Sequence, residues 1–297
     1  MENILRKNLK WEKPGYGEGF VMRKNRESEV ISITENKRTV KTAGVGKAGF
    51  IPDFLREAAR RFGGECLDLL FPRICPLCGT IVTKEEGLIC RNCVPKAERL
   101  FLREPLCKKC GKQLESEIQE YCFDCTAHPK LFSQGVSLFA YRDEAKESMM
   151  GFKYHNKREY ADYYAGQLMD RYGDRLRQAG AQAVIPVPLH AKKLRDRGYN
   201  QAEVLARRLG ASLELPVYPK GLIRVQDTAP QKTLQGSQRG KNLYHAFRAG
   251  KLPKGLASVI LVDDIYTTGA TMNACSEALK KAGVRRIFCV SVCSGRN

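Results

Sequence analysis

The sequence predicts an α/β protein in which a parallel β-sheet is preceded by a small zinc-binding domain. Downstream of residue 131, fully apolar runs of strand length alternate with amphipathic helical segments. This alternation is typical of a parallel sheet that is covered by helices on both faces. Upstream of that point, eight of the twelve cysteines form four CxxC pairs, which favours metal binding.

We divide the 297 residues into three segments. Residues 1–50 mix glycine, lysine and glutamate with little periodicity, and we expect a flexible N-terminal extension. Residues 51–130 begin with helical spacing of apolar residues at 54–70 and continue into the cysteine region. Residues 131–297 form the predicted α/β domain.

The cysteine region consists of two matching halves. Eleven residues separate the two CxxC pairs in each half, and the halves repeat with a period of 32. Zn²⁺ takes four soft ligands at the corners of a tetrahedron, and two hairpin knuckles supply them. We therefore predict two structural zinc sites. Their ligands are Cys75, Cys78, Cys90, Cys93, Cys107, Cys110, Cys122 and Cys125.

Redox-active CxxC pairs and an iron–sulfur cluster are alternative uses of these cysteines. We favour pairing of consecutive CxxC motifs over crossed pairing, although spacing alone leaves both open. Coordination by four cysteines leaves no open position on the metal, so the sites would stabilise the fold rather than catalyse.

The predicted elements of the α/β domain alternate along the chain. They are a strand at 135–141, a helix at 159–178, a strand at 183–189, a helix at 201–213, a strand at 258–262, a helix at 271–282 and a strand at 287–292. Ligands of such sheets bind beyond the carboxyl ends of the strands. Polar residues at those ends are therefore candidate site residues.

One strand end has the pattern of a phosphate site. Four apolar residues at 259–262 lead into Asp263 and Asp264, and a threonine- and glycine-rich turn then opens a helix. Backbone amides and hydroxyls of residues 267–271 would hold a phosphate at the helix N-terminus. The two carboxylates suit sugar hydroxyls or a hydrated Mg²⁺.

This segment resembles the phosphoribosyl-pyrophosphate (PRPP) motif of type I phosphoribosyltransferases, which has four apolar residues, two acidic residues and TTGxT. The segments 186–190 and 195–201 resemble the signature of the ComF/GntX family. The resemblance covers residues 54–297. It implies a type I phosphoribosyltransferase fold preceded by a double zinc ribbon.

The resemblance also implies the ligand site, with Mg²⁺ accompanying PRPP or a related phosphosugar. The PRPP-binding residues would be Asp263, Asp264, Thr267, Thr268, Gly269, Ala270 and Thr271. The pyrophosphate site and its basic loop would comprise His190, Arg195, Arg197, Gly198, Asn200, Arg224, Arg239 and Lys153. Purine-salvage enzymes of this type carry an acidic residue at the position of Thr267, and threonine cannot exchange protons near pH 7. The catalytic residues, and whether the chain is an enzyme, therefore stay open.

The charge distribution suggests a phosphate-rich partner. The formal charge is +19, and residues 151–297 hold 25 basic against 11 acidic side chains. Competence-associated members of the family imply a role in DNA uptake, in which single-stranded DNA is handled in the cytosol together with competence motor or recombination proteins. Tyr199, Tyr244 and Phe247 are candidate stacking platforms for bases. The alternative is an active phosphoribosyltransferase with an unidentified nucleobase or other acceptor.

The expected location is the cytoplasm. No apolar run approaches the about 18 residues that a membrane-spanning helix needs, and residues 1–20 lack the apolar core of a secretory signal.

Overall fold

The computed structural model describes residues 72–83, 85–225 and 246–295. The chain divides into two units, 1–64 and 65–297, and all described residues belong to the second. The predicted extension and the helix at 54–70 lie outside the described residues.

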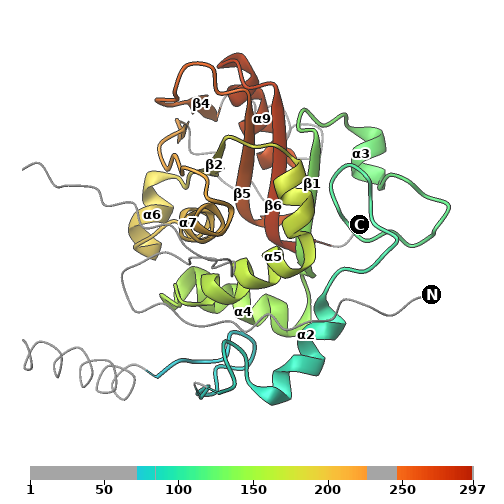
Figure 1. Ribbon diagram of the computed structural model, residues 1–297, viewed down its shortest axis with the longest axis vertical. Coiled ribbons are helices and arrows are strands. Elements are labelled where there is room, and N and C mark those ends of the chain that lie inside the picture. The colour runs from blue at the N-terminus through green and yellow to red at the C-terminus, as the bar shows by residue number, and fades with distance from the viewer. Residues whose placement is uncertain (1–71, 84, 226–245, 296–297) are drawn as a thin grey trace, which may run out of the picture. The chain divides into compact units, whose positions relative to one another are not determined.

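Four parallel strands form the main sheet (Figure 1). In spatial order they are β1 (Gln134–Ala140), β6 (Arg286–Ser294), β5 (Ser258–Tyr266) and β2 (Ala183–Pro186). Their residues are almost all buried, as expected for strands covered on both faces. The predicted parallel α/β sheet is confirmed.

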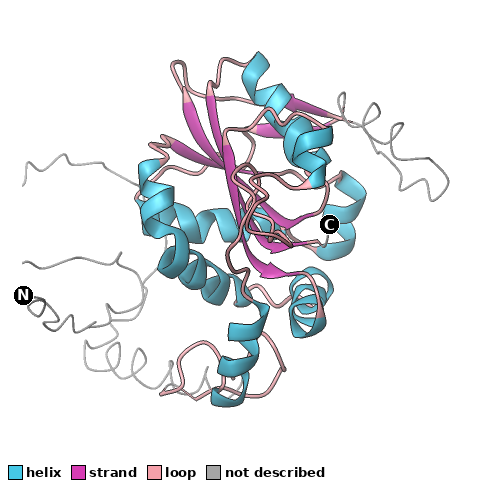
Figure 2. Cartoon of the chain, turned by 90° about the vertical axis from the view of Figure 1, so that its right-hand side faces the viewer, coloured by secondary structure: helices cyan, strands magenta, loops and turns pink. Residues whose placement is uncertain are grey.

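Helices cover both faces of this sheet (Figure 2). Alternate strand residues enter different cores, so Ile260 and Val262 of β5 face one core while Val259 and Leu261 face the other. The first core contains α4 (Asp143–Tyr154), α5 (Tyr160–Gln178) and α7 (Gln201–Leu213). The second contains α9 (Ala270–Lys281) and the antiparallel pair β3 (Leu222–Arg224) and β4 (Phe247–Ala249).

Two strand boundaries differ from the prediction by three or more residues. β5 runs four residues beyond Val262, because it stays paired with β6 as far as Tyr266 opposite Ser294. β2 ends at Pro186 rather than at residue 189, and Pro188 has no N–H to continue the ladder. The chain instead leads into a short helix, α6 (Ala191–Arg197), which the sequence analysis did not predict.

The cysteine region folds as the predicted repeat. Bridges between Ile74 and Ile81 and between Leu106 and Gln113 close the two knuckles at equivalent positions. In both halves the glycine amide after the CxxC pair donates to the first cysteine carbonyl at 2.9 Å. Short helical segments follow, namely η1 (Arg91–Cys93), α2 (Val94–Leu100) and α3 (Phe123–Ala127).

The two halves, called ribbon 1 (residues 74–93) and ribbon 2 (residues 106–125), join different cores. Cysteines of ribbon 1 lie in the core that contains α5, whereas cysteines of ribbon 2 lie in the core that contains α9. The ribbons are thus incorporated into the packing on both faces of the sheet.

Equivalent glycines of the two ribbons provide a test of this difference. Gly79 and Gly111 have the same backbone conformation, with φ +74°. A Cβ atom at Gly111 would lie 2.7 Å from the Gly135 carbonyl oxygen in β1. A Cβ atom at Gly79 would have no heavy atom of the described residues within 4 Å, apart from its own chain neighbours. We predict that Gly111→Ala lowers the free energy of unfolding by about 1–3 kcal/mol more than Gly79→Ala, measured by denaturant unfolding of zinc-loaded protein. Equal losses would contradict the packing of ribbon 2 against β1.

Candidate functional site

The eight cysteines form two separate clusters. Cys75, Cys78, Cys90 and Cys93 make one, and Cys107, Cys110, Cys122 and Cys125 make the other, each with ligand atoms within 4.8 Å of one another. The sulfur atoms of Cys78 and Cys90, and of Cys110 and Cys122, are 3.6 Å apart. A zinc–sulfur distance of about 2.3 Å in a tetrahedron places sulfurs about 3.8 Å apart, so both clusters fit zinc. Pairing of consecutive CxxC motifs is confirmed.

The cluster of ribbon 2 is the more enclosed. Cys110 is buried, whereas the equivalent Cys78 is exposed. Lys112, two residues after Cys110, is also buried and forms an ion pair with Asp124 at 2.7 Å. The backbone N–H of Cys122 donates to the sulfur of Cys107 at 3.4 Å, an interaction that favours the thiolate.

The acidic pair lies within β5 rather than in the turn after it, which corrects the predicted end of the strand. Because β2 ends opposite Val262, Asp263 and Asp264 extend past the neighbouring strand. Successive residues of a strand point to opposite faces, so the two carboxylates have different surroundings.

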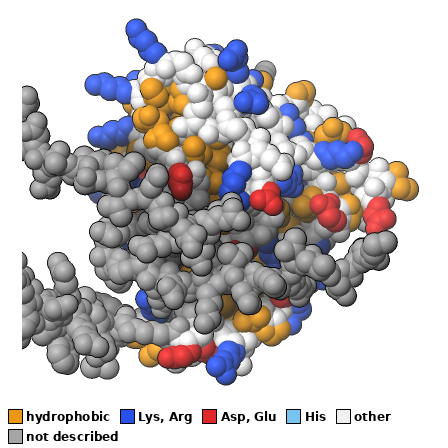
Figure 3. Space-filling view, viewed as in Figure 1, with side chains coloured by type: hydrophobic (Ala, Val, Ile, Leu, Met, Phe, Trp, Pro, Cys, Tyr) orange, Lys and Arg blue, Asp and Glu red, His pale blue; other side chains and the backbone are white. Residues whose placement is uncertain are grey.

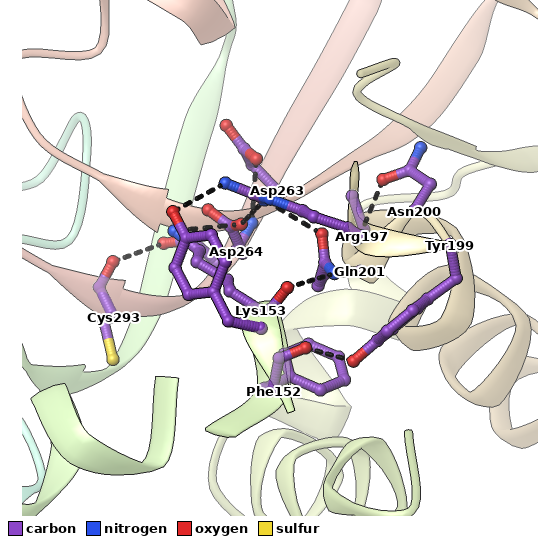
Figure 4. Close-up of polar contacts among 12 residues, drawn as sticks. Phe152, Lys153, Arg197, Tyr199, Asn200, Gln201, Asp263, Asp264 and Cys293 are labelled. Atoms are coloured by element: carbon purple, nitrogen blue, oxygen red, sulfur yellow. Dashed lines mark hydrogen bonds and ion pairs between the residues drawn. The ribbon is translucent and has the colours of Figure 1, made fainter. Parts of the chain in front are cut away.

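Two cations from other elements reach Asp264 (Figure 4). Its Oδ2 lies 3.1 Å from Nζ of Lys153, at the end of α4, and 3.9 Å from Nη1 of Arg197, at the end of α6. The carboxylate and the lysine side chain are each only 14% exposed. The ion pairs therefore offset the cost of burying the carboxylate.

Arg197 is held by residues that the sequence analysis did not include in the site. Its guanidinium donates to Oε1 of Gln201 at 3.0 Å and to the hydroxyl of Tyr154 at 3.2 Å, and lies over the Tyr154 ring. The amide of fully buried Gln201 also donates to the Lys153 carbonyl at 3.4 Å. Gln201 ends the segment 195–201 already singled out, so that segment was the available signal.

Asp263 has a strongly perturbed acidity. Burial and the neighbouring charge of Asp264 raise the pKa of Asp263 to about 7. The backbone N–H of Asp264, which donates to Asp263 at 2.8 Å, and the charges of Lys153 and Arg224 act in the opposite direction. The positive charge of Arg224, on β3, thus acts on the acidic pair.

The threonine turn, residues 267–271, follows β5 directly. Thr267 and Thr268 are exposed, and Gly269 has φ +77° and caps the N-terminus of α9. A Cβ atom at Gly269 would overlap the Tyr266 hydroxyl, so glycine is required by both conformation and space. Ala270 donates its N–H to the Thr268 hydroxyl at 3.4 Å, and Thr271 lies in the first turn of α9.

Three of the predicted pyrophosphate residues cap the helices α6 and α7 next to the site. His190 caps α6 by accepting from the Lys192 N–H at 3.3 Å, and Gly198 ends that helix with φ +74°. Asn200 caps α7 and donates to the Val187 carbonyl at 3.0 Å. Of the other two residues not yet placed, Arg195 is exposed on α6, and Arg239 lies outside the described residues.

Two of the three predicted stacking aromatics are buried and therefore not available to bases. Tyr199 is 6% exposed and Phe247 is 5% exposed, because each packs in one of the two cores. Tyr244 lies outside the described residues. Over the ranges that the structure describes, no helix is long and apolar enough to cross a membrane.

The chain is similar to known proteins over most of its length. Residues 66–126 match the double zinc ribbon domain family, and residues 194–297 match the phosphoribosyl transferase domain family. Competence protein F of Haemophilus influenzae is 31% identical over 70% of this chain and 91% of that protein. DNA utilization protein YhgH of Salmonella typhimurium is 27% identical over 76% and 98%, and competence protein ComFC of Bacillus subtilis is 24% identical over 67% and 81%.

The acidity of Asp263 predicts a pH dependence of stability. The unfolded carboxyl loses its proton near its ordinary pKa of 3.8, whereas the folded one retains it up to about pH 7. The folded state therefore binds more protons between these values, and this contribution to stability is lost as the pH rises through that window. Relative to wild type, Asp263→Asn should gain about 2–4 kcal/mol in free energy of unfolding between pH 5 and pH 8.

Denaturant unfolding at several pH values measures this difference. Asp170→Asn, which neutralises an exposed carboxylate on α5, is the matched control and should give a difference that does not change with pH. A flat profile for Asp263→Asn would show that Asp263 is not held protonated by its surroundings.

Proposed function

Because the chain belongs to the competence protein F family, with double zinc ribbon and phosphoribosyl transferase domains, we propose that it binds PRPP and handles single-stranded DNA in the cytosol during natural competence. One observation carries the ligand assignment. The acidic pair, the threonine turn and the cations around Asp264 meet at the carboxyl edge of a parallel sheet, where such folds bind ligands.

The threonine turn would hold the 5′-phosphate of PRPP. Its amides lie at the N-terminus of the 12-residue helix α9, where the helix dipole favours an anion. Asp263 and Asp264 would take the ribose hydroxyls or the hydrated Mg²⁺ that accompanies PRPP, since hard cations and hydroxyls both suit carboxylate oxygens. A cation there would also relieve the charge repulsion that raises the pKa of Asp263.

The cations around Asp264 would serve the pyrophosphate group. Lys153 and Arg197 are held in place by Asp264 and Gln201, and Arg224 lies near Asp263. An incoming pyrophosphate offers these cations a stronger negative partner in a partly buried site. Exposed Arg195 on α6 would add further positive charge, and Arg239 stays a predicted member of the basic loop.

An active phosphoribosyltransferase is the second candidate function. The assembled arrangement of carboxylates, turn and cations favours it, because transfer from PRPP needs mainly positioning and charge stabilisation. Exposed Thr267 stands where a purine-salvage enzyme has its acid, so a purine acceptor is disfavoured. Release of pyrophosphate with an added acceptor would establish this function.

The single-stranded DNA proposal is supported by charge and by the relatives. Of the three relatives named above, two are named for competence and one for DNA utilization. Exposed Lys192, Lys193 and Arg195 follow one another along α6, at the same edge of the sheet as the acidic pair. Lysine and arginine side chains also project on the β4 side of the face in Figure 3. The zinc ribbons are our proposed docking surfaces for competence motor or recombination proteins.

PRPP binding provides the first test. We predict that PRPP with Mg²⁺ binds zinc-loaded protein in isothermal titration calorimetry, and that Asp263→Asn with Asp264→Asn weakens binding at least about tenfold, because the ribose and Mg²⁺ ligands are lost. Asp170→Asn with Asp174→Asn removes the same charge from the exposed surface of α5 and should leave binding unchanged. Absence of heat from wild type at millimolar PRPP would refute the ligand assignment.

Salt dependence provides a test of DNA binding. Each phosphate neutralised on a single strand adds about 0.7 to the slope of log affinity against log salt. We predict that replacing Lys192, Lys193 and Arg195 with glutamine lowers this slope by about 2. Glutamine at Lys280, Lys281 and Arg285, exposed at the opposite edge of the sheet, should leave it unchanged. Equal effects of the two triple variants would exclude α6 as the DNA-binding surface.

A further inference from the structure

The hydroxyl of Tyr266 is buried without a hydrogen-bond partner. Tyr266 is 3% exposed, and its hydroxyl is one of two such side-chain atoms within the described ranges. A buried hydroxyl without an acceptor costs about 1–3 kcal/mol. An acceptor is therefore expected beside it in the functional protein.

Sulfur atoms of the ribbon 2 cluster are among the groups around this hydroxyl, together with the backbone of Gly269. Burial, followed by the sulfur atoms of Cys110 and Cys125, raises the pKa of Tyr266. Tyr266, Cys110 and Phe132 lie in one core, and the two aromatic rings meet edge to face with centroids 6.3 Å apart. A zinc-bound cysteine is a thiolate, whose sulfur accepts hydrogen bonds better than a thiol does.

The same tyrosine supports the threonine turn. Tyr266 is the last residue of β5, and Gly269 packs directly on its phenol ring. The chain after ribbon 2 reaches the same region, since Lys130 donates to the Thr268 carbonyl at 2.9 Å. Next to it, the N–H of Leu131 donates to Oδ1 of Asn273 in α9 at 2.6 Å.

We propose that Tyr266 is a positioning residue whose hydroxyl donates a hydrogen bond to a zinc-bound sulfur of ribbon 2, foremost that of Cys110. Zinc in this cluster then orders the threonine turn through the tyrosine ring. The cluster of ribbon 1 lies in the other core and provides an internal comparison. The coupling concerns the turn itself, and only its effect on PRPP rests on the proposed function.

Cadmium NMR tests the contact between hydroxyl and sulfur. Full-length protein loaded with cadmium has two four-cysteine sites and should give two resonances. Tyr266→Phe should shift one of them and leave the other in place. Tyr172→Phe removes another buried hydroxyl, one that donates to the Ser137 carbonyl at 3.1 Å, and should shift neither. Two unshifted resonances in Tyr266→Phe would overturn the proposal.

Hydrogen exchange tests the effect on the turn without any ligand. In zinc-loaded protein, Tyr266→Phe should speed amide exchange in residues 267–271 by about three- to tenfold, the factor that loss of one hydrogen bond produces. Tyr172→Phe should leave exchange there unchanged. Unchanged exchange in Tyr266→Phe would overturn the positioning role even if a cadmium resonance shifts.

PRPP with Mg²⁺ then tests the link to the ligand. Tyr266→Phe should weaken its binding by about three- to tenfold. Coupling is reciprocal, so PRPP should slow zinc release from ribbon 2 to a chelator in wild type and do so less in the variant. If wild type binds no PRPP, the proposed function fails, while the coupling still stands or falls on the cadmium and exchange measurements.

Discussion

The site depends on how the buried charge of Asp264 is balanced. A carboxylate at the carboxyl edge of β5 is costly to bury, and Lys153 and Arg197 compensate it from the ends of α4 and α6. Gln201 and Tyr154 in turn fix Arg197. The C-terminal ends of α4 and α6 thus both contact the carboxyl end of β5. Together they form a polar site at the edge of an apolar sheet.

Zinc extends the cores on both faces of the sheet. A ribbon of about twenty residues buries too little apolar surface to fold alone, so metal binding and packing have to act together. Ribbon 1 completes the core beneath α5, and ribbon 2 completes the core beside α9. The repeat in sequence therefore serves two distinct structural environments. The core that holds ribbon 2 also contains Tyr266, on which Gly269 of the threonine turn packs.

This arrangement relates the two proposed activities to separate parts of the chain. A phosphorylated sugar suits the enclosed edge where carboxylates, turn and cations meet. A nucleic-acid strand suits the exposed lysines and arginine of α6, which need no enclosure because phosphate contacts are electrostatic. Helix α6 also supplies Arg197 to the acidic pair. The proposed DNA-binding residues and the proposed PRPP site are therefore joined by one short helix.

The sequence by itself determined the features that local patterns encode. CxxC spacing predicted both zinc clusters, apolar alternation predicted the parallel sheet, and the acidic pair with TTGxT predicted a site at the end of β5. Tertiary structure alone decided that β5 extends through that pair, because its pairing with β6 overrides its polarity. It also decided that Lys153 meets Asp264 and that Tyr199 and Phe247 are buried. Such contacts join residues far apart in the chain, where spacing carries no information.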